Sequence, residues 1–307
     1  MNPDLFLADL QEKPDRLRAL DLDGCWDFVT GRPPVLLLGM GSSHYADQVA
    51  AARLRAAGIP AVAELASSDL LPRVRPGTLV IAVSASAGSA ETVDAVARLG
   101  VPFVALANKS GRLTEFAERT VWMQAGEERG GVACRSFQHT LILLLELVRR
   151  LTGAPATPLD KTIEAVEHLL ASEEDWRPRL DELLLGPHGT HIVAPARRIS
   201  SAYQSALMLR EGPRLPAVGC ETGDWSHVDV YLTKTTDYRM LLLGGSRWDA
   251  QLLDWTRQRG STVVSLGHEI PDATYTLRHP HDDNDDVRLL TETLVAELIA
   301  ARAWASG

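Results

Sequence analysis

The chain has 307 residues, 45% of them hydrophobic, which is enough for two domains of ordinary size with substantial cores. Its formal net charge of −9 argues against nucleic acid as a partner, because a phosphate backbone is bound by clustered Lys and Arg. Three widely spaced cysteines with no CxxC pair argue against a disulfide framework and a zinc site. Neither a secretory leader nor an apolar run of membrane-spanning length is recognisable, so we expect a soluble cytoplasmic protein without a membrane partner.

Strands and helices alternate along most of the chain. Hydrophobic periodicity predicts an amphipathic helix over 4–20 and then, in the first half, strands at 35–40, 61–65, 79–83, 102–107 and 120–123 and helices at 43–57, 91–99, 113–118 and 136–151. Two helices, 159–171 and 173–185, precede a second series with strands at 191–194, 240–243, 262–266 and 275–277 and helices at 200–210, 249–259 and 286–304. Such alternation is typical of parallel sheets covered by helices on both faces.

These elements predict an α/β protein with two doubly wound parallel sheets. We expect a helical segment at 1–29, a first domain at 30–155, a helical linker at 156–186 and a second domain at 187–307. The repetition of one plan is typical of a duplication, although no repeat is visible in the sequence itself.

A glycine- and serine-rich turn, Gly39-Met-Gly41-Ser42-Ser43, ends the first strand. Glycine lets a backbone approach a ligand closely, and serine is a good residue to begin a helix. An ordinary tight turn with a helix cap is the alternative interpretation.

A second turn, Ser84-Ala-Ser86-Ala-Gly88-Ser89-Ala-Glu91-Thr92, follows the strongest predicted strand and opens a helix. Hydroxyls and backbone amides gathered in this way bind phosphate. Ligands of open parallel sheets bind beyond the carboxyl ends of the strands, so two such turns in one half point to one crevice. A solvated, flexible loop is the alternative interpretation.

The second half offers an acid and a base. Glu211 ends a predicted helix, and His227 lies in the segment Glu221-Thr-Gly-Asp-Trp-Ser-His227 beyond it. A carboxylate and an imidazole are the groups that a proton transfer on a sugar phosphate needs, although each residue alone would be ordinary. The acidic and histidine-rich run 279–286 matches no metal-site spacing and is expected to cap the last helix, so we expect neither a metal nor a cofactor.

Taken together, these motifs resemble the sugar isomerase (SIS) domain over about residues 30 to 300. They resemble most the tandem-SIS isomerase half of glucosamine-6-phosphate synthase and related sugar-phosphate isomerases and deaminases. The turns at 39–43 and 84–92 and the segment Gly131-Val132-Ala133-Cys134 look like the family's phosphosugar loops. Ala206-Leu-Met-Leu-Arg-Glu211 and the segment 221–229 look like its catalytic motifs.

The resemblance implies a role for each matching position. Glu211 would be the base that moves a proton between C1 and C2, and His227 would assist ring opening, from the neighbouring subunit of a homodimer. The implied sugar-phosphate-binding residues are Gly41, Ser42, Ser43, Ser84, Ala85, Ser86, Gly88, Ser89, Thr92, Val132, Ala133 and Cys134.

Several positions depart from the family pattern. Met208, Ala85 and Cys134 stand where the family has a lysine, a glutamine and a serine, and Val228-Asp229 replaces a Gly-Pro. The family's C-terminal lysine tail and an N-terminal glutamine-hydrolysing domain are not recognisable, which argues against Schiff-base chemistry and glutamine-driven amination. We therefore expect an aldose–ketose sugar-phosphate isomerase. The alternatives are an amino-sugar-phosphate deaminase and a non-catalytic sugar-phosphate sensor.

Overall fold

The computed structural model describes residues 1–306 and divides the chain into two compact units. The first unit comprises Asp15–Glu128 and Ala133–Thr157. The second unit comprises Met1–Pro14, Arg129–Val132 and residues 158–306. Contacts therefore group the first 14 residues with the second half of the chain, whereas the four segments expected from the sequence remain a prediction. Each unit is described by itself below.

The first unit is built on a five-stranded parallel sheet. Its strands are β1 (Val35–Gly39), β2 (Ala61–Leu65), β3 (Leu79–Val83), β4 (Val104–Ala107) and β5 (Arg119–Trp122), in the order β2-β1-β3-β4-β5. Val35 of β1 pairs with Ala61 on one side and with Leu79 on the other. The central strands β1, β3 and β4 are buried almost throughout, as expected for strands covered on both faces.

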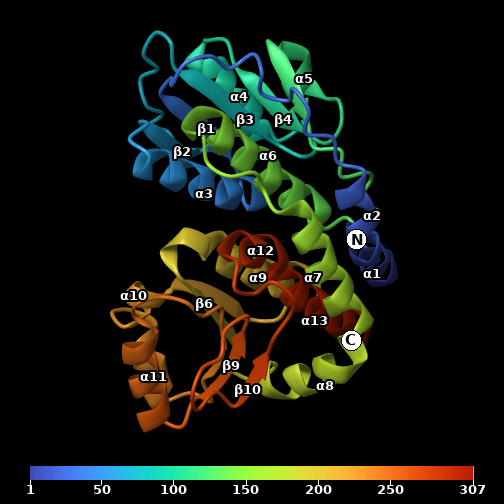
Figure 1. Cartoon of the computed structure of the whole chain (residues 1–307), viewed down its shortest axis with the longest axis vertical. Coiled ribbons are helices and arrows are strands. Elements are labelled where there is room, and N and C mark those ends of the chain that lie inside the picture. The colour runs from blue at the N-terminus through green and yellow to red at the C-terminus, as the bar shows by residue number, and fades with distance from the viewer. Residues whose placement is uncertain (307) are drawn as a thin grey trace. The chain divides into compact units, whose positions relative to one another are not determined.

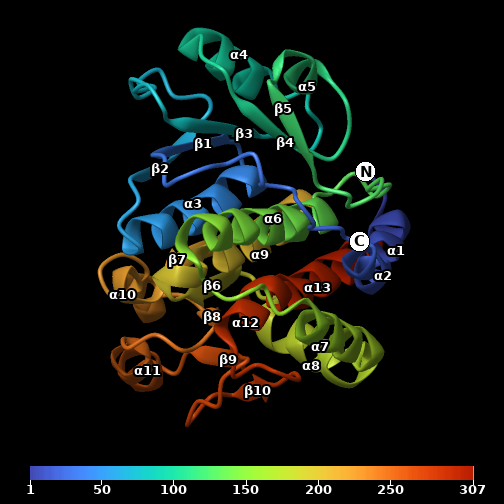
Figure 2. The same ribbon diagram turned by 45° about the horizontal axis from the view of Figure 1, so that its top comes forward.

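Helices cover both faces of this sheet (Figure 2). The helices α3 (Ser42–Ala56) and α6 (Arg135–Thr152) lie on one face, and α4 (Ala90–Leu99) and α5 (Arg112–Phe116) lie on the other. The second face holds a core that includes Val80, Ala82 and Ala95. The helix α2 (Lys13–Arg18) precedes the sheet along the chain.

The second unit repeats this plan (Figure 1). Its strands are β6 (Thr190–Ala194), β7 (Ala217–Glu221), β8 (Arg239–Leu242), β9 (Thr262–Leu266) and β10 (Tyr275–Leu277), all parallel, in the order β10-β9-β8-β6-β7. In both sheets the first strand of the set lies between the second and the third. The strand order of the first unit is therefore reproduced, and the predicted fold class, α/β with two doubly wound parallel sheets, is confirmed.

The helices of the second unit are α1 (Pro3–Gln11), α7 (Leu159–Ala171), α8 (Glu173–Leu184), α9 (Ile199–Glu211), α10 (Thr222–Trp225), α11 (Asp249–Gln258), α12 (Asp285–Thr291) and α13 (Thr293–Ser306), with 3-10 helices η1 (Ala196–Arg198) and η2 (Asp229–Lys234). Trp225 of α10 and Leu252 of α11 share a buried core with the strand residues Val193 and Met240. Among the described residues, no helix is both long enough and apolar enough to cross a membrane.

The structure differs from the expected elements in three places. The helix expected over 4–20 is divided into α1 and α2, because Pro14 has no amide hydrogen and its ring obstructs a continuous helix. The helix expected over 286–304 is divided at Glu292 into α12 and α13. The strand β7 was not expected, since Ala217-Val-Gly-Cys-Glu221 is short and contains a glycine. A Cβ on Gly219 would lie 2.9 Å from the backbone of Ala202, so glycine is what allows α9 to pack closely on β7.

Candidate functional site

In the first sheet, the neighbouring strands β1 and β3 end side by side. After β1 the chain enters α3 on one face, and after β3 it enters α4 on the other face (Figure 2). This divergence is the topological switch point at which doubly wound sheets bind their ligands. Both turns that the sequence singled out, Gly39–Ser43 and Ser84–Ser89, lie at this edge of the sheet.

The turn after β1 is exposed at its tip. Gly41 has a φ of 50°, which favours glycine, and it leads into Ser42 and Ser43 in the first turn of α3. Both serines are half-buried. Beneath the turn, a Cβ on Gly39 would lie 2.6 Å from a carboxylate oxygen of Asp47, so glycine is required there for packing rather than for its backbone angles.

The turn after β3 places two hydroxyls next to each other. Ser84 is 5% exposed and its Oγ lies 3.4 Å from the Oγ of the exposed Ser86. The amide of Gly88 donates to Ser86 Oγ at 3.2 Å. Between them Ala87 has a φ of 51°, an uncommon value for alanine, and its carbonyl accepts from Leu113. Uncommon backbone angles of this kind cluster at ligand sites.

Ser89 and Thr92 form the cap of α4. The Oγ of Ser89 accepts from the amide of Thr92 at 3.3 Å and from its hydroxyl at 3.1 Å, and it donates to Glu91 at 2.9 Å. Thr92 is only 1% exposed. Its hydroxyl is therefore already engaged within the cap, whereas Ser86 remains accessible at the tip of the turn.

Glu128, which the motif analysis did not single out, occupies the start of α6. One of its oxygens accepts from the amides of Cys134, Arg135 and Ser136 at 2.7, 2.8 and 3.0 Å, and the other accepts from the hydroxyl of Ser136 at 2.6 Å. A carboxylate at this position satisfies the free amides of the helix and interacts favourably with its dipole.

The three residues expected from the segment 131–134 are little exposed. Val132 and Cys134 are buried and Ala133 is half-buried, and contacts assign Val132 to the second unit but Ala133 and Cys134 to the first. The amide of Cys134 is taken by Glu128, so this part of the helix start is not available to an anion.

The expected catalytic base lies in the second unit. Glu211 is the last residue of α9 and is half-buried. The helix ends there because Gly212 leaves helical geometry and packs against Trp304, to which a Cβ on Gly212 would come within 3.0 Å. Met208, one turn before Glu211, is fully buried and accepts from Gln204 at its sulfur, 3.6 Å away.

The expected histidine is exposed. Glu221, at the end of β7, caps α10 through hydrogen bonds from Gly223 and Asp224 at 2.7 and 2.9 Å. His227 follows this short helix, and its amide donates to Asp224 at 2.8 Å. The segment is the end of a strand followed by a turn of helix, which fixes the backbone of His227.

Buried aromatic groups hold this segment to the sheet. Trp225 donates from its indole nitrogen to the hydroxyl of Tyr238 at 2.7 Å, and Tyr238 stacks on His191 of β6 with a centroid distance of 4.0 Å. His191 in turn lies 3.7 Å from Asp229, two residues after His227. Burial raises the pKa of Tyr238, so it stays a neutral hydrogen-bonding group over the physiological range.

Sequence comparison gives two curated relatives, both glutamine–fructose-6-phosphate aminotransferases (isomerizing). The protein of Pyrococcus horikoshii is 24% identical over 259 residues, which are 77% of this chain and 42% of that protein. The protein of Sulfurisphaera tokodaii is 21% identical over 204 residues, which are 65% of this chain and 35% of that protein. The chain thus spans less than half the length of these relatives. No protein-family model matches it.

Solved structures with the same fold cover almost the whole chain. The C-terminal domain of glucosamine-fructose-6-phosphate aminotransferase from Francisella tularensis superimposes with a TM-score of 0.82 at 16% identity, covering 98% of this chain and 96% of that domain. Glucosamine-6-phosphate deaminase from Thermotoga maritima and tagatose-6-phosphate ketose/aldose isomerase from Escherichia coli both give a TM-score of 0.78 at 16% identity, covering 98% of this chain and 94% and 92% of theirs. At these identities the likeness shows the fold, which is that of phosphosugar isomerases.

Proposed function

We propose that the protein is a sugar-phosphate aldose–ketose isomerase whose serine loops bind the phosphate and whose base is Glu211. The observation that carries this proposal is the turn after β3, where the accessible hydroxyl of Ser86 lies beside Ser84 at the carboxyl end of the sheet. The names of the relatives and of the proteins with the same fold support a phosphorylated sugar as the ligand.

The proposed chemistry is a proton transfer within the substrate. His227 would protonate the ring oxygen as its bond to C1 breaks, and it would take up the proton that the C1 hydroxyl loses as the C1 carbonyl forms. Glu211 would then remove the proton from C2 of the aldose while O1 gains a proton and the C1 carbonyl becomes a hydroxyl. It would return its proton to C1 as O2 loses a proton and C2 becomes the carbonyl, so that the proton gained by O1 equals the one lost by O2. No external oxidant or reductant is needed, because C2 is oxidised as C1 is reduced.

Glu211→Gln tests the proposed base. Glutamine keeps the size and the hydrogen-bonding ability of the side chain but cannot accept the C2 proton, so turnover should fall by about 100-fold or more while binding is preserved. The assay is NMR of glucose 6-phosphate, fructose 6-phosphate and related hexose and pentose phosphates in D2O, in which an enediol intermediate exchanges deuterium into C1 or C2.

Glu269→Gln is the matched control, because Glu269 is an exposed glutamate of the same unit outside the proposed site. Equal turnover of the parent and of Glu211→Gln would remove Glu211 from the mechanism.

Ser84→Ala with Ser86→Ala should weaken binding of the same substrate, and unchanged binding would contradict the role of the turn after β3.

The same assay separates the two alternatives. Ammonia released from glucosamine 6-phosphate would identify a deaminase. A sensor is favoured by one observation, namely that Ala85 and the buried Met208 offer no donor at two positions next to the proposed site residues. Binding without conversion of any sugar phosphate would establish the sensor and exclude both enzymes.

A homodimer is part of the proposal. His227 is exposed and is followed by exposed apolar side chains at Val228, Tyr231 and Leu232, which are 50%, 62% and 40% exposed. Such a patch is typical of a surface that pairs with another chain. Pairing there would let one subunit supply His227 to the site of the other.

A further inference from the structure

The second sheet has a crevice. It lies beyond the carboxyl ends of β6 and β8, the two strands that correspond to β1 and β3 in the first sheet. A pocket of about 490 Å³ lies at this point, lined by residues 195–197 after β6, by residues 245–248 after β8 and by Glu221 at the end of β7. The position is the one at which doubly wound sheets bind ligands, but its side chains differ entirely from those of the turns after β1 and β3.

Arginines converge below the pocket at Gly245. This glycine has a φ of 108°, and a Cβ placed on it would lie 2.9 Å from Arg288, 3.4 Å from Arg197 and 3.9 Å from Arg198. The positive φ favours glycine here, and a larger residue would also crowd the guanidinium group of Arg288. Their geometry is fixed from beneath, since Arg197 and Arg198 both pair with Asp285 and the fully buried Arg198 also pairs with Glu292 at 3.0 Å.

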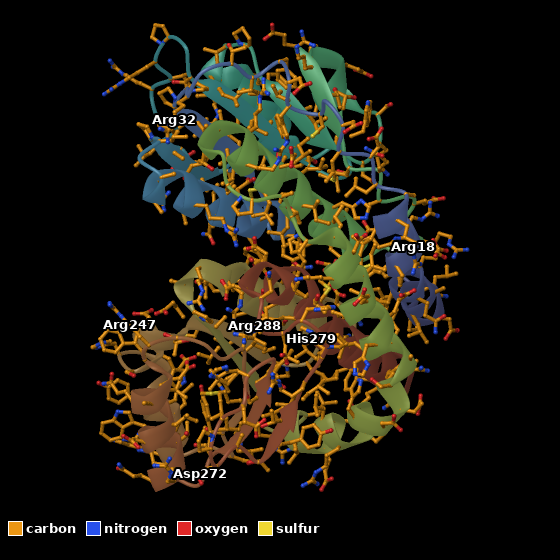
Figure 3. All side chains as sticks on the ribbon, in the orientation of Figure 1. Arg18, Arg32, Arg247, Asp272, His279 and Arg288 are labelled. Atoms are coloured by element: carbon orange, nitrogen blue, oxygen red, sulfur yellow. The ribbon has the colours of Figure 1, made fainter. Side chains whose placement is uncertain are left out.

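Arg247 adds a cation on the open side. It is exposed, has no carboxylate partner among the described residues, and lies over the ring of Trp248 with its guanidinium carbon 4.8 Å from the ring centre. In Figure 3, Arg247 lies at the outer edge of the second unit, whereas Arg288 lies within the fold. Trp248 itself is 43% exposed and offers an indole surface to a ring.

Two backbone amides of this crevice are already satisfied. Asp249 accepts from the amides of Gly245 and Ser246 at 2.6 and 3.0 Å. These two amides are not available to an anion, and the side chains of Arg197 and Arg247 are the charged groups of the lining that can bind one, unlike at the turn after β3, where serine hydroxyls are accessible. One oxygen of Glu221 caps α10, and its other oxygen accepts no hydrogen bond from the described residues, which leaves an acceptor for hydroxyl groups.

We infer that this crevice is a second ligand site, which binds an organic phosphate that carries hydroxyl groups. The phosphate lies against Arg197 and Arg247, the hydroxyls donate to Glu221, and the carbon skeleton packs on Trp248. A ligand with an anion at one end and a polyol at the other suits a pocket lined by both arginines and a carboxylate, because Glu221 would repel a second anionic group. The site does not depend on the proposed isomerase activity. A ligand bound there would regulate or supplement the binding or reaction that takes place at the turns after β1 and β3.

Calorimetric titration of the full chain with fructose 6-phosphate tests this site. The titration is done in a Ser84→Ala, Ser86→Ala background, so that binding at the turn after β3 does not mask it. Arg247→Ala should weaken the remaining binding by about tenfold or more, since it removes a charged hydrogen-bonding partner. Arg257→Ala is the matched control: it removes an equally exposed arginine from α11 that pairs with Asp254 and Asp272 and does not line the pocket.

Equal binding of fructose 6-phosphate by Arg247→Ala and Arg257→Ala would overturn the inference. So would the absence of binding in the Ser84→Ala, Ser86→Ala background. Inorganic phosphate should bind at least tenfold more weakly than fructose 6-phosphate, and equal affinity would overturn the role of Glu221. Failure of the isomerase proposal gives a different result. The parent protein then converts no sugar phosphate, but the Ser84→Ala, Ser86→Ala variant still binds fructose 6-phosphate, and Arg247→Ala weakens that binding.

Discussion

At the scale of single residues, two kinds of carboxyl group distinguish this protein. Glu128 and one oxygen of Glu221 accept hydrogen bonds from backbone amides, which is the ordinary way to place an acid at a helix start. Asp47 of α3 is fully buried beneath Gly39, and neither of its oxygens has a hydrogen-bond partner among the described residues. Burial raises the pKa of Asp47 well above its ordinary value.

Asp47→Asn should therefore stabilise the protein at neutral pH. Because the pKa of Asp47 is raised, the folded state holds a proton that the unfolded state releases. Asp47 therefore lowers the stability of the protein as the pH rises above 3.8, the ordinary pKa of an aspartate. Asparagine has the same shape and no charge to bury, so we expect a gain of about 1 kcal/mol or more at pH 7 that vanishes near pH 4.

Thermal unfolding between pH 4 and 8 measures this difference. The exposed Asp69, in the same unit, provides the control Asp69→Asn, which should leave the melting temperature unchanged. A loss of stability in Asp47→Asn at every pH would contradict the prediction. It would show that the Asp47 carboxyl group stabilises the folded protein rather than destabilising it at neutral pH.

At the scale of elements, the start of α6 is held by one side chain. Glu128 accepts four hydrogen bonds from three successive residues, so its loss leaves several amides of a long, buried helix without a partner. This helix packs on α3, which begins in the turn of Ser42 and Ser43. The cap therefore stabilises a helix that supports this turn.

Glu128→Ala should lower the free energy of unfolding by about 1–2 kcal/mol, the usual loss when a helix cap is removed. Chemical denaturation measures it. Glu128→Gln keeps an acceptor oxygen and should recover part of the loss, whereas Glu118→Ala, at an exposed glutamate of the same unit, should have little effect. Equal stability of Glu128→Ala and the parent would mean that water replaces the carboxylate without cost.

At the scale of the whole molecule, the proposed dimer predicts that two inactive variants can restore activity when they pair, provided that each lacks a different catalytic residue. Glu211→Gln lacks the base and His227→Ala lacks the group for ring opening. In a two-fold symmetric dimer with shared sites, a mixed dimer holds one site with both changes and one site with neither.

Mixing equal amounts of the two variants should thus restore about a quarter of the parental turnover, because half of the dimers are mixed and each has one intact site. Turnover is measured with the substrate found by NMR, after the subunits have exchanged. No recovery, with mixed dimers demonstrated by differential tagging, would place both residues of each site in one chain.

Much of this architecture was predictable because it depends on local pattern. Short apolar runs between turn residues marked nine of the ten strands, and the serine and glycine turns were located correctly at the carboxyl ends of β1 and β3. Glu211 was correctly expected at a helix end, and the fold class followed from the alternation of elements. The roles of these residues in binding and catalysis remain predictions.

The tertiary structure decided what depends on contacts between distant residues. Lys13 is an ordinary polar residue in the sequence, yet it is 1% exposed and pairs with the buried Glu297 at 2.6 Å. The arginines around Gly245 come from η1 and α12, and no local motif announces that they meet. Periodicity and turn chemistry act over a few residues and are visible in the sequence, whereas burial and charge pairing arise only when the packing of the folded chain brings remote side chains together.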